Sequence, residues 1–448
     1  MTPEPPTLDS QVEVSPGDWF RLWGVFVRYW QSILSSDFAK KVLATYATRI
    51  LLMGMGLATT VLVARLLGPQ GRGFYAVAVA TGALGVQFGS LGLHSSNVYF
   101  AAREPSSLDR LIGNSLVVSL GVGGLISVTT AVVLTVAPNL IALRGTTLGL
   151  VLIWIPFGLA YLLMQNLMLG VQDVRGYNVL EVVNKALTLV LIGALVVAGW
   201  VSVASFFAMG VVALVVTCVL LLTRLHIHFA GLPRLSVNLF RHSVEYALKA
   251  HLAAFFCFLV LRADLFMVQH MLGPEQAGYY SIASTMADHV SVLAVVIASI
   301  LFPKLSALPD IQTKLQITRK AVGGTIMLLF PLLAVASLLA GPAVHFLFGT
   351  AFLPASSAFI LLMPGMLFLG LNTVGVQFLN SIGYPKIVVI IWGLCSVLNI
   401  GANLWVIPRY GIRGASLVSS ISYFLAFFFN IQVIRRTAVG IGQATIQA

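Results

Sequence analysis

Long apolar runs, separated by short polar connections, follow one another along almost the entire chain. A run of about 18 or more apolar residues is long enough to cross a bilayer as a helix. The pattern predicts twelve such helices, at 39–66, 73–101, 108–136, 146–169, 177–199, 202–223, 243–271, 276–302, 315–340, 356–381, 386–407 and 413–434. The apolar segment 342–355 is too short to span, and we expect it to lie at the membrane interface or to re-enter the membrane.

Composition supports the same assignment. The 448 residues are 58% hydrophobic and 9% charged, and the mean hydropathy is +0.96. Because soluble globular chains carry about 25% charged residues, this composition excludes a water-soluble protein. Cys218, Cys257 and Cys395 lie inside apolar runs and have neither metal-ligand spacing nor an obvious pairing. The chain is therefore predicted to be an all-α integral membrane protein without a separate soluble domain.

A short motif occurs once in each half of the chain. The first copy, LLGPQGRGFYAVA, covers Leu66 to Ala78, and the second, MLGPEQAGYYSIA, covers Met271 to Ala283. An offset of 205 aligns the two Leu-Gly-Pro triplets, and each copy joins two long apolar runs. Internal repeats of this kind are typical of secondary transporters. We therefore expect about twelve transmembrane helices in two pseudo-symmetric six-helix lobes around a central cavity.

The pattern divides the chain into five segments. The first is rich in Pro and acidic residues, and then in aromatic residues interleaved with Arg, which favours a helix in the headgroup layer or a cap packed on the bundle. The segments are a cytoplasmic N-terminal extension with this interfacial aromatic helix (1–37), an N-terminal lobe (38–226), a cytoplasmic inter-lobe connection (227–242), a C-terminal lobe (243–436) and a tail (437–448).

Basic residues are distributed unevenly between the two sides of the predicted bundle. Seventeen Lys and Arg residues fall on the side that holds the N-terminus and the even-numbered loops, against five on the other side. Cytoplasmic loops of membrane proteins carry such an excess. Both termini are therefore predicted to be cytoplasmic, and most of the net charge of +12 follows from this bias.

A few charged residues lie inside the predicted spans, where each ionised side chain costs several kcal/mol and needs a specific reason. Arg49 lies in a polar part of the first span, so it either lines a cavity or extends to the cytoplasmic surface. Arg262 and Asp264 lie in the seventh span and point about 200° apart, so each needs a partner on another helix. We expect Arg262 to face the central cavity.

Asp288 and His289 lie near the middle of the eighth span, where a carboxylate beside a histidine suggests a protonatable site. Asp288 is the leading candidate for coupling transport to an H⁺ or Na⁺ gradient, Asp264 is the second, and His289 ranks below both. The alternative is a structural role, through a hydrogen bond to a neighbouring helix or an ion pair with Arg262.

Two Glu–Lys pairs, Glu181 with Lys185 and Glu245 with Lys249, have the i,i+4 spacing of a helical ion pair. A local ion pair is the simpler interpretation of both. Lys185 and Lys249 nevertheless stay candidate substrate-binding residues, because each lies near the end of a predicted span.

The chain contains none of several motifs that mark catalytic or nucleotide-binding sites. There is no His-Glu-x-x-His, no Gly-x-Ser-x-Gly and no Gly-x-x-x-x-Gly-Lys-Ser/Thr. We therefore expect no catalytic residues, no metal site, no nucleic-acid partner and no cofactor beyond a coupling ion. Energy for transport must then come from an ion gradient or from consumption of the product.

Several segments resemble a known transporter family. They are LVARLLGPQGRGFYA after the first span, LRADLFMVQHMLGPEQAGYYSIA across the seventh and eighth spans, ILFPKLS (Ile300 to Ser306) and GYPKIVVIIWGLCSVLNIGANLWVIPRYGIRGASL (Gly383 to Leu417). In this order, over residues 38 to 436, they look like the Wzx-type lipid-linked oligosaccharide flippases. These polysaccharide biosynthesis and export proteins belong to the multidrug/oligosaccharidyl-lipid/polysaccharide exporter superfamily.

The resemblance implies a flippase that moves polyprenyl-diphosphate-linked oligosaccharide to the outer leaflet of the bacterial inner membrane. The product would serve assembly of O-antigen, capsule or exopolysaccharide. Alternating access between the lobes is implied, with Arg49 and Arg262 suited to the diphosphate because guanidinium matches phosphate geometry. Membrane lipids are implied partners, and a polysaccharide polymerase with its export machinery is a further candidate.

Other functions stay open at this point. A cation-coupled multidrug exporter of the same superfamily shares the fold, although it is expected to line its cavity with carboxylates rather than arginines. A non-transporting membrane scaffold of a polysaccharide assembly complex would not need charges at mid-membrane depth. A flippase for lipid-linked peptidoglycan precursors would usually carry two further spans, which do not appear after Arg436.

Overall fold

The computed structural model describes residues 37–229, 231–383 and 386–446. Within these residues the elements are all helical: α2 (Asp37–Gly89), α3 (Leu93–Arg103), η1 (Pro105–Ser107), α4 (Leu108–Val136), α5 (Gly145–Gly170), α6 (Val174–Val197), α7 (Val203–His226), α8 (Val237–Leu272), α9 (Pro274–Ser306), α10 (Ile311–Leu338), α11 (Ala340–Phe348), η2 (Thr350–Phe352), α12 (Pro354–Ser381) and α13 (Lys386–Ile446). The chain divides into two units after Gly54, and helix packing is described within the second unit, from Met55 on.

Ten helical stretches are long and apolar enough to cross a membrane, and two of these contain two spans each. The stretch Thr48–Gly89 has 42 residues, and its helical length of about 63 Å is twice the thickness of the bilayer core. Gly68, with φ of 66°, ends its first helix, and Pro69 begins the next because its fixed φ suits the first helical position. Gly411, with φ of 62°, divides α13 in the same way. The predicted all-α fold with about twelve spans is confirmed.

Several boundaries differ from the sequence-based prediction, and α13 continues to Ile446, beyond the predicted end at 434. The second predicted span, 73–101, is wrong in its last part, because α2 ends at Gly89 and a left-handed pair, Leu91 (φ 47°) and Gly92 (φ 77°), turns the chain into α3. Helix α8 begins at Val237 rather than at 243. The short segment 342–355 does not span: it forms the end of α11, η2 and the start of α12.

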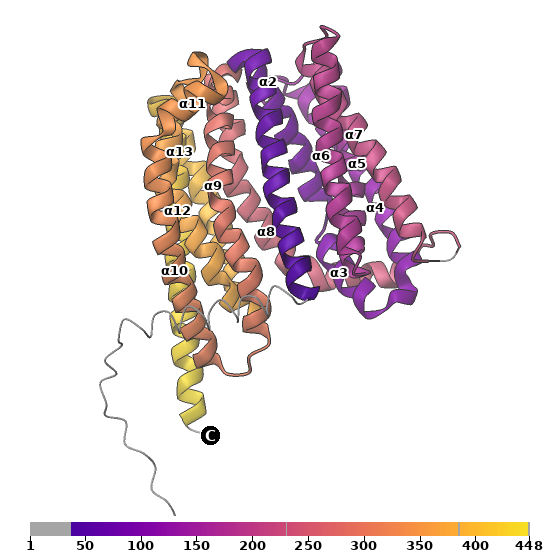
Figure 1. The fold of residues 1–448 in the computed structure, drawn as a ribbon, viewed down its shortest axis with the longest axis vertical. Helices are drawn as coiled ribbons and strands as arrows, with labels where there is room; N and C mark the ends of the chain where they lie inside the picture. Colours follow the sequence, from indigo (N-terminus) through magenta and orange to yellow (C-terminus); the bar gives the residue numbers. More distant parts are fainter. Residues whose placement is uncertain (1–36, 230, 384–385, 447–448) are drawn as a thin grey trace, which may run out of the picture. The chain divides into compact units, whose positions relative to one another are not determined.

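The helices from Met55 on form two lobes, one made by α2 to α7 and the other by α8 to α13 (Figure 1). In the C-terminal lobe α12 is central: 56% of its apolar stretch is buried, and it packs on α9, α10 and α13. In the N-terminal lobe α5 packs on α4 and α7, whereas α6 lies at the edge, with 6% of its apolar stretch buried. This two-lobe arrangement matches the repeat that the sequence predicted.

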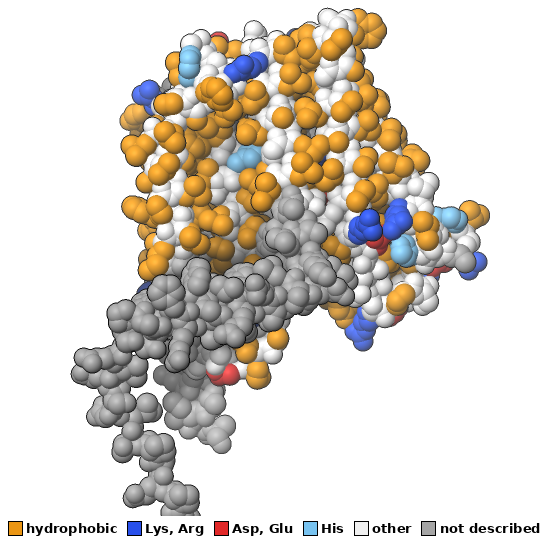
Figure 2. Space-filling view, in the orientation of Figure 1, with side chains coloured by type: hydrophobic (Ala, Val, Ile, Leu, Met, Phe, Trp, Pro, Cys, Tyr) orange, Lys and Arg blue, Asp and Glu red, His pale blue; other side chains and the backbone are white. Residues whose placement is uncertain are grey.

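The outward-facing side chains are those of a protein surrounded by lipid. Figure 2 shows mostly hydrophobic side chains over the middle of the visible face, with Lys, Arg and acidic side chains towards its ends. Within the spans Val197, Met327 and Leu338 are 91%, 80% and 81% exposed. Soluble proteins rarely expose continuous apolar surface of this kind, so these side chains face the hydrocarbon core.

The two lobes meet at the end where both Leu-Gly-Pro motifs lie, which we call the Gly-Pro end. Arg65 on α2 donates from Nε to the carbonyl oxygen of Leu347 (2.8 Å) and from Nη2 to that of Phe346 (2.5 Å), both at the end of α11. Nδ1 of His270, near the end of α8, lies 2.8 Å from the carbonyl oxygen of Asn139 in the connection between α4 and α5. Hydrogen bonds therefore join the lobes directly at this end.

The first turns of α8 are attached to the N-terminal lobe, near the opposite ends of the helices. The side-chain amide of Asn114 on α4 donates to the carbonyl oxygen of Ser236 (2.9 Å) and accepts from the backbone N–H of the same residue (3.0 Å). The rings of Tyr99 on α3 and Tyr246 on α8 stack with centroids 4.6 Å apart. The connection between the lobes is thus fixed to the N-terminal lobe before α8 enters the C-terminal one.

Candidate functional site

Two oppositely charged side chains meet inside the C-terminal lobe. Arg262 lies about 15 Å from the C-terminal end of α8, and Asp288 about 21 Å from the start of α9, so both are deep in their spans. Nη2 of Arg262 is 2.8 Å from Oδ2 of Asp288. The ion pair offsets much of the cost of placing either charge within the membrane.

The Arg262–Asp288 ion pair is accessible rather than sealed. The two side chains are 35% and 41% exposed. Arg262 makes no second hydrogen bond among the residues that the structure describes, so most of its N–H donors are uncommitted. Because a guanidinium fork matches carboxylate and phosphate oxygens, this side chain can bind a further anion.

Asp264 forms a separate and buried site. Asp264 is only 1% exposed, so its carboxylate is buried. Oδ2 accepts hydrogen bonds from the hydroxyl groups of Tyr280 and Ser419, the latter at 2.7 Å, and Oδ1 accepts from the backbone N–H of Leu265 at 2.8 Å. One carboxylate therefore joins α8, α9 and α13. Three donors favour its charged form while burial favours the neutral form, which is a balance that a proton or small cation can shift.

The helical spacing of Arg262 and Asp264 explains why two distinct sites arise from neighbouring positions. Two residues apart on a helix, their side chains leave α8 in nearly opposite directions. Arg262 finds its partner on α9, and Asp264 finds partners on α9 and α13. As the spacing required, each partner comes from another helix.

His289 is not directed at its neighbour in sequence. Its Nδ1 lies 2.6 Å from the carbonyl oxygen of Thr285, one turn earlier on α9. Asp288 takes Arg262 as its charged partner instead. The adjacent Asp–His pair that the sequence suggested is therefore not an interacting pair in this conformation.

Three residues with buried polar groups escaped the sequence interpretation, two in the C-terminal lobe and one in the N-terminal lobe. Tyr280 stands in the second Leu-Gly-Pro motif and Ser419 in an apolar run, and neither position signals an acidic partner. Arg72, one of the five basic residues on the less basic side of the predicted bundle, lies in the first turn of α2 after the kink and is 7% exposed. Its guanidinium carbon is 5.8 Å from the ring centre of Tyr75, and its Nε has no acceptor among the described residues.

Amide side chains join the last helices of the C-terminal lobe. Asn430 on α13 donates to Asn372 on α12 (2.9 Å). Asn399 donates to Ser422 (3.0 Å), which links the two parts of α13 on either side of its kink. These contacts hold helices together, which is the common use of polar side chains inside membranes.

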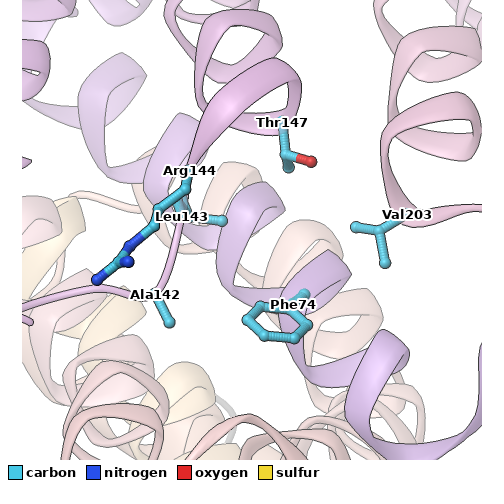
Figure 3. Close-up of a pocket in the computed structure, with 6 residues that line it drawn as sticks. All are labelled: Phe74, Ala142, Leu143, Arg144, Thr147 and Val203. Atoms are coloured by element: carbon cyan, nitrogen blue, oxygen red, sulfur yellow. The ribbon is translucent and has the colours of Figure 1, made fainter. Parts of the chain in front are cut away.

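A pocket of about 420 Å³ lies at the Gly-Pro end of the N-terminal lobe. Figure 3 shows the guanidinium of Arg144 directed away from the side chains of Phe74 and Val203. Apart from Arg144 and Thr147 the lining is apolar, and none of the predicted site residues contributes to it; the lining residues are Phe74, Ala142, Leu143, Arg144, Thr147 and Val203. The charged groups of the C-terminal lobe are thus not part of this pocket.

Comparison with known proteins decides the family. The family model described as polysaccharide biosynthesis protein matches residues 62–357, which is more than half of the chain. The chain belongs to this family. The resemblance drawn from the sequence motifs is therefore confirmed at the level of family.

Other similarities agree with this assignment. An uncharacterized membrane protein of Methanocaldococcus jannaschii is 28% identical over 158 residues, which span 35% of this chain but only 31% of that protein. An inward-facing multidrug resistance MATE family transporter of the MOP superfamily has a TM-score of 0.70, with 16% identity, over 87% of this chain and 95% of that one. The lipid II flippase MurJ, in an inward closed conformation, has a TM-score of 0.68, with 16% identity, over 88% and 87%. At such identities the structures share the fold.

One further predicted site residue of this polysaccharide biosynthesis family member, Lys185, does not join the C-terminal charges. Lys185 is exposed on α6, in the other lobe, and forms no ion pair within the described residues. The side chain of Lys249 lies outside the described part of the chain, and Glu245 pairs with Arg241 at 2.9 Å. Arg49 belongs to the first unit, so its role as a second cation stays a prediction.

Proposed function

We propose that the protein is a flippase that carries polyprenyl-diphosphate-linked oligosaccharide from the cytoplasmic to the outer leaflet of the bacterial inner membrane. Its product would be used to assemble O-antigen, capsule or exopolysaccharide. Membership of the polysaccharide biosynthesis family carries this proposal. The two-lobe fold suits alternating access, and an accessible arginine inside a span suits an anionic substrate.

The diphosphate would bind at Arg262. One Nη2–Oδ2 contact to Asp288 leaves the rest of the guanidinium fork to receive phosphate oxygens. A diphosphate that approaches Arg262 competes with Asp288, so substrate binding weakens the ion pair and leaves the carboxylate in need of a proton or cation. Arg49 is the proposed second cation, and Lys185 and Lys249 are weaker candidates.

The same competition offers a route to coupling with an H⁺ or Na⁺ gradient. Asp288 would take up the ion when the diphosphate occupies Arg262, and Asp264 would hold a second ion among its hydroxyl partners. A ligand shifts a two-state equilibrium only through different affinities for the two states. The affinity of Asp264 for an ion would differ between the two states if movement of α9 or α13 changed its distance from Tyr280 or Ser419.

The proposed orientation follows the positive-inside rule. Both termini would be cytoplasmic, and the Gly-Pro end would face the outside of the inner membrane. In the described conformation the lobes are joined at the Gly-Pro end, which would be the outer end in this orientation. A polysaccharide polymerase would then receive the product at the outer leaflet.

Deletion of the gene in its native host tests the substrate class. We expect loss of surface polysaccharide, together with accumulation of polyprenyl-linked repeat units inside the cell. Normal surface polysaccharide with increased drug sensitivity would favour a multidrug exporter instead. If an Arg262→Ala protein restored surface polysaccharide fully, a scaffold that does not transport would be favoured.

Reconstituted vesicles test the coupling. Asp288→Asn should flip lipid-linked oligosaccharide without responding to an imposed H⁺ or Na⁺ gradient, whereas the unmodified protein should accelerate under one of them. Equal rates for the unmodified protein with every gradient collapsed would exclude coupling. His289→Gln tests the third candidate in the same assay, and we expect it to keep the response to the gradient because His289 contacts its own helix and not Asp288.

A further inference from the structure

The two Leu-Gly-Pro motifs, far apart in sequence, touch each other at the Gly-Pro end. A Cβ atom placed on Gly73 would overlap the carbonyl oxygen of Pro274, and one placed on Gly278 would overlap the carbonyl oxygen of Pro69. The same Cβ atoms would lie 3.0 Å from the backbone nitrogen of Gly278 and 3.2 Å from that of Gly73, respectively. Each glycine therefore packs on the first turn of the opposite helix.

The contact is reciprocal, as the sequence repeat would require. In both copies a proline at the first position of a helix is followed four residues later by a glycine, Pro69 with Gly73 and Pro274 with Gly278. Small residues one turn apart let two helices cross with their backbones in contact. The α2 and α9 copies exchange the same contact, as two elements related by a two-fold axis do.

Only glycine fits at the two crossing points. The obstructing atoms are backbone carbonyl groups, which cannot turn aside as a flexible side chain can. Both glycines are buried, and Ala76 and Ala277 beside them belong to one apolar cluster that spans the two lobes. Because separation by even a methyl radius removes most of the close contacts, packing of this kind favours a joined or a separated state over intermediates.

We propose that these four residues, which we call the glycine clasp (Pro69, Gly73, Pro274 and Gly278), form the latch that closes the Gly-Pro end. The clasp parts whenever the lobes open there, and re-forms by backbone packing alone. The Arg65 and His270 hydrogen bonds surround it and add to closure. This inference requires only that the lobes separate, and it is independent of the molecule that is transported.

The clasp is also adjacent to the buried carboxylate site. Gly278 and Tyr280 lie two residues apart on α9, and Tyr280 donates its hydroxyl hydrogen bond to Asp264. The first two turns of α9 thus hold the latch on one side and a partner of Asp264 on the other. A change at Asp264 that moves Tyr280 acts on the same rigid turns that carry the latch.

Cysteine cross-linking measures whether the clasp sets the closed state. In a protein whose three native cysteines are replaced by Ala, Asn139→Cys and His270→Cys report contact between the lobes at the Gly-Pro end. Adding Gly73→Ala or Gly278→Ala should lower the cross-linking rate about tenfold, because the inserted methyl group prevents the closed packing. The double variant should behave like either single variant, since one clash already opens the latch.

The control substitution is Gly56→Ala, which lies on α2 with no other atom near its Cβ position and should leave the rate unchanged. A second cysteine pair, Asn97→Cys with Ser115→Cys inside the N-terminal lobe, verifies folding of each variant. If one clasp variant fails this folding check, the other tests the same contact from the opposite lobe. Unchanged cross-linking in a folded clasp variant, or an equal fall with Gly56→Ala, would overturn the proposal.

Discussion

The two lobes share their turns but not their charges. At the offset of 205 that aligns the Leu-Gly-Pro motifs, Leu57, Thr59 and Ala83 occupy the N-terminal positions of Arg262, Asp264 and Asp288. Thr59 donates its hydroxyl to the carbonyl oxygen of Met55 (2.9 Å) on its own helix, whereas Asp264 binds α9 and α13. These three ionisable groups of the C-terminal lobe thus have neutral counterparts in the N-terminal lobe.

This difference between the lobes separates closure at the Gly-Pro end from the binding of charged ligands. The clasp needs both copies of the motif, because each glycine packs on the other copy, so closure of the lobes depends on the repeat. The cation, the accessible acid and the buried acid on which the proposed binding and coupling depend all lie in the C-terminal lobe. The buried cation of the N-terminal lobe, Arg72, has no acid partner within the described residues.

The largest expected effect is on transport through Arg262. Arg262→Ala should reduce flipping of lipid-linked oligosaccharide about tenfold to a hundredfold, because hydrogen bonds to a charged substrate are lost. Arg262→Lys should recover part of the rate, since it keeps the charge but not the fork. Arg409→Ala, which removes an exposed cation stacked 4.3 Å from Trp405, is the control and should transport normally. Normal transport by Arg262→Ala would contradict the proposed binding of the diphosphate at Arg262.

The same substitution should have opposite effects on stability in the two lobes. Arg72→Met should raise the free energy of unfolding by about 2 kcal/mol, because a buried cation without an acid partner is replaced by an apolar side chain. Arg262→Met should lower it by about 1 kcal/mol, since Asp288 loses its partner but stays partly accessible. Thermal unfolding in detergent measures both, and shifts of equal sign would show that the cations are equivalent.

The tyrosines of the two motifs allow a finer comparison. Tyr280→Phe should lower the free energy of unfolding by about 1–3 kcal/mol, because the buried Asp264 loses a hydrogen-bond donor. Tyr75→Phe should cost less, because the ring of Tyr75 packs on Phe207 with centroids 6.1 Å apart and no hydrogen bond of its hydroxyl is found among the described residues. Equal losses measured for the two variants would mean that Asp264 does not depend on Tyr280.

The smallest effect is a pH dependence outside the membrane. Asp173 caps α6 by accepting from the backbone N–H of Gly176 (2.9 Å), and it pairs with Arg224 at 2.8 Å. Partial burial opposes its charge, but the hydrogen bonds from Arg224 and Gly176 prevail and lower the pKa of Asp173. Its stabilisation is therefore present above the unfolded pKa of about 3.9 and is lost as the pH falls through the lower folded value.

Asp173→Asn should consequently cost about 1 kcal/mol at pH 7 and progressively less as the pH falls from the unfolded pKa towards the lower folded pKa, because the unmodified protein then loses the same stabilisation. Unfolding temperatures from pH 3 to 7 measure the difference. Asp310→Asn, which changes the cap of α10 in the C-terminal lobe, is the parallel variant, because Asp310 accepts from the backbone N–H groups of Gln312 and Thr313. A constant difference across this range would exclude titration of Asp173 as the cause.

The number of spans and the two-lobe organisation were determined by the sequence itself. The length of each apolar run can be compared with the thickness of the bilayer without knowing any tertiary contact. The break in α2 can also be predicted from neighbouring residues alone, because Gly68 ends one helix and Pro69 begins the next. The misplaced end of the second span shows the limit of this reasoning. Ser90 to Gly92 carry no strong helix breaker beyond one glycine. Leu91 adopts a left-handed conformation there, and Gly92 packs closely against Ala247 on α8, a contact that the local sequence does not signal.

Only the tertiary structure decided which polar groups meet. The sequence required a partner on another helix for Arg262 and left several open, and the packing of α8 on α9 selected Asp288. Ser419 lies 155 residues from Asp264, and nothing local distinguishes it from the other serines of α13. The clasp joins Gly73 to Pro274 in the same way. Helix formation is set by neighbours in sequence and by the membrane, whereas these contacts depend on which helix faces meet once the lobes are assembled.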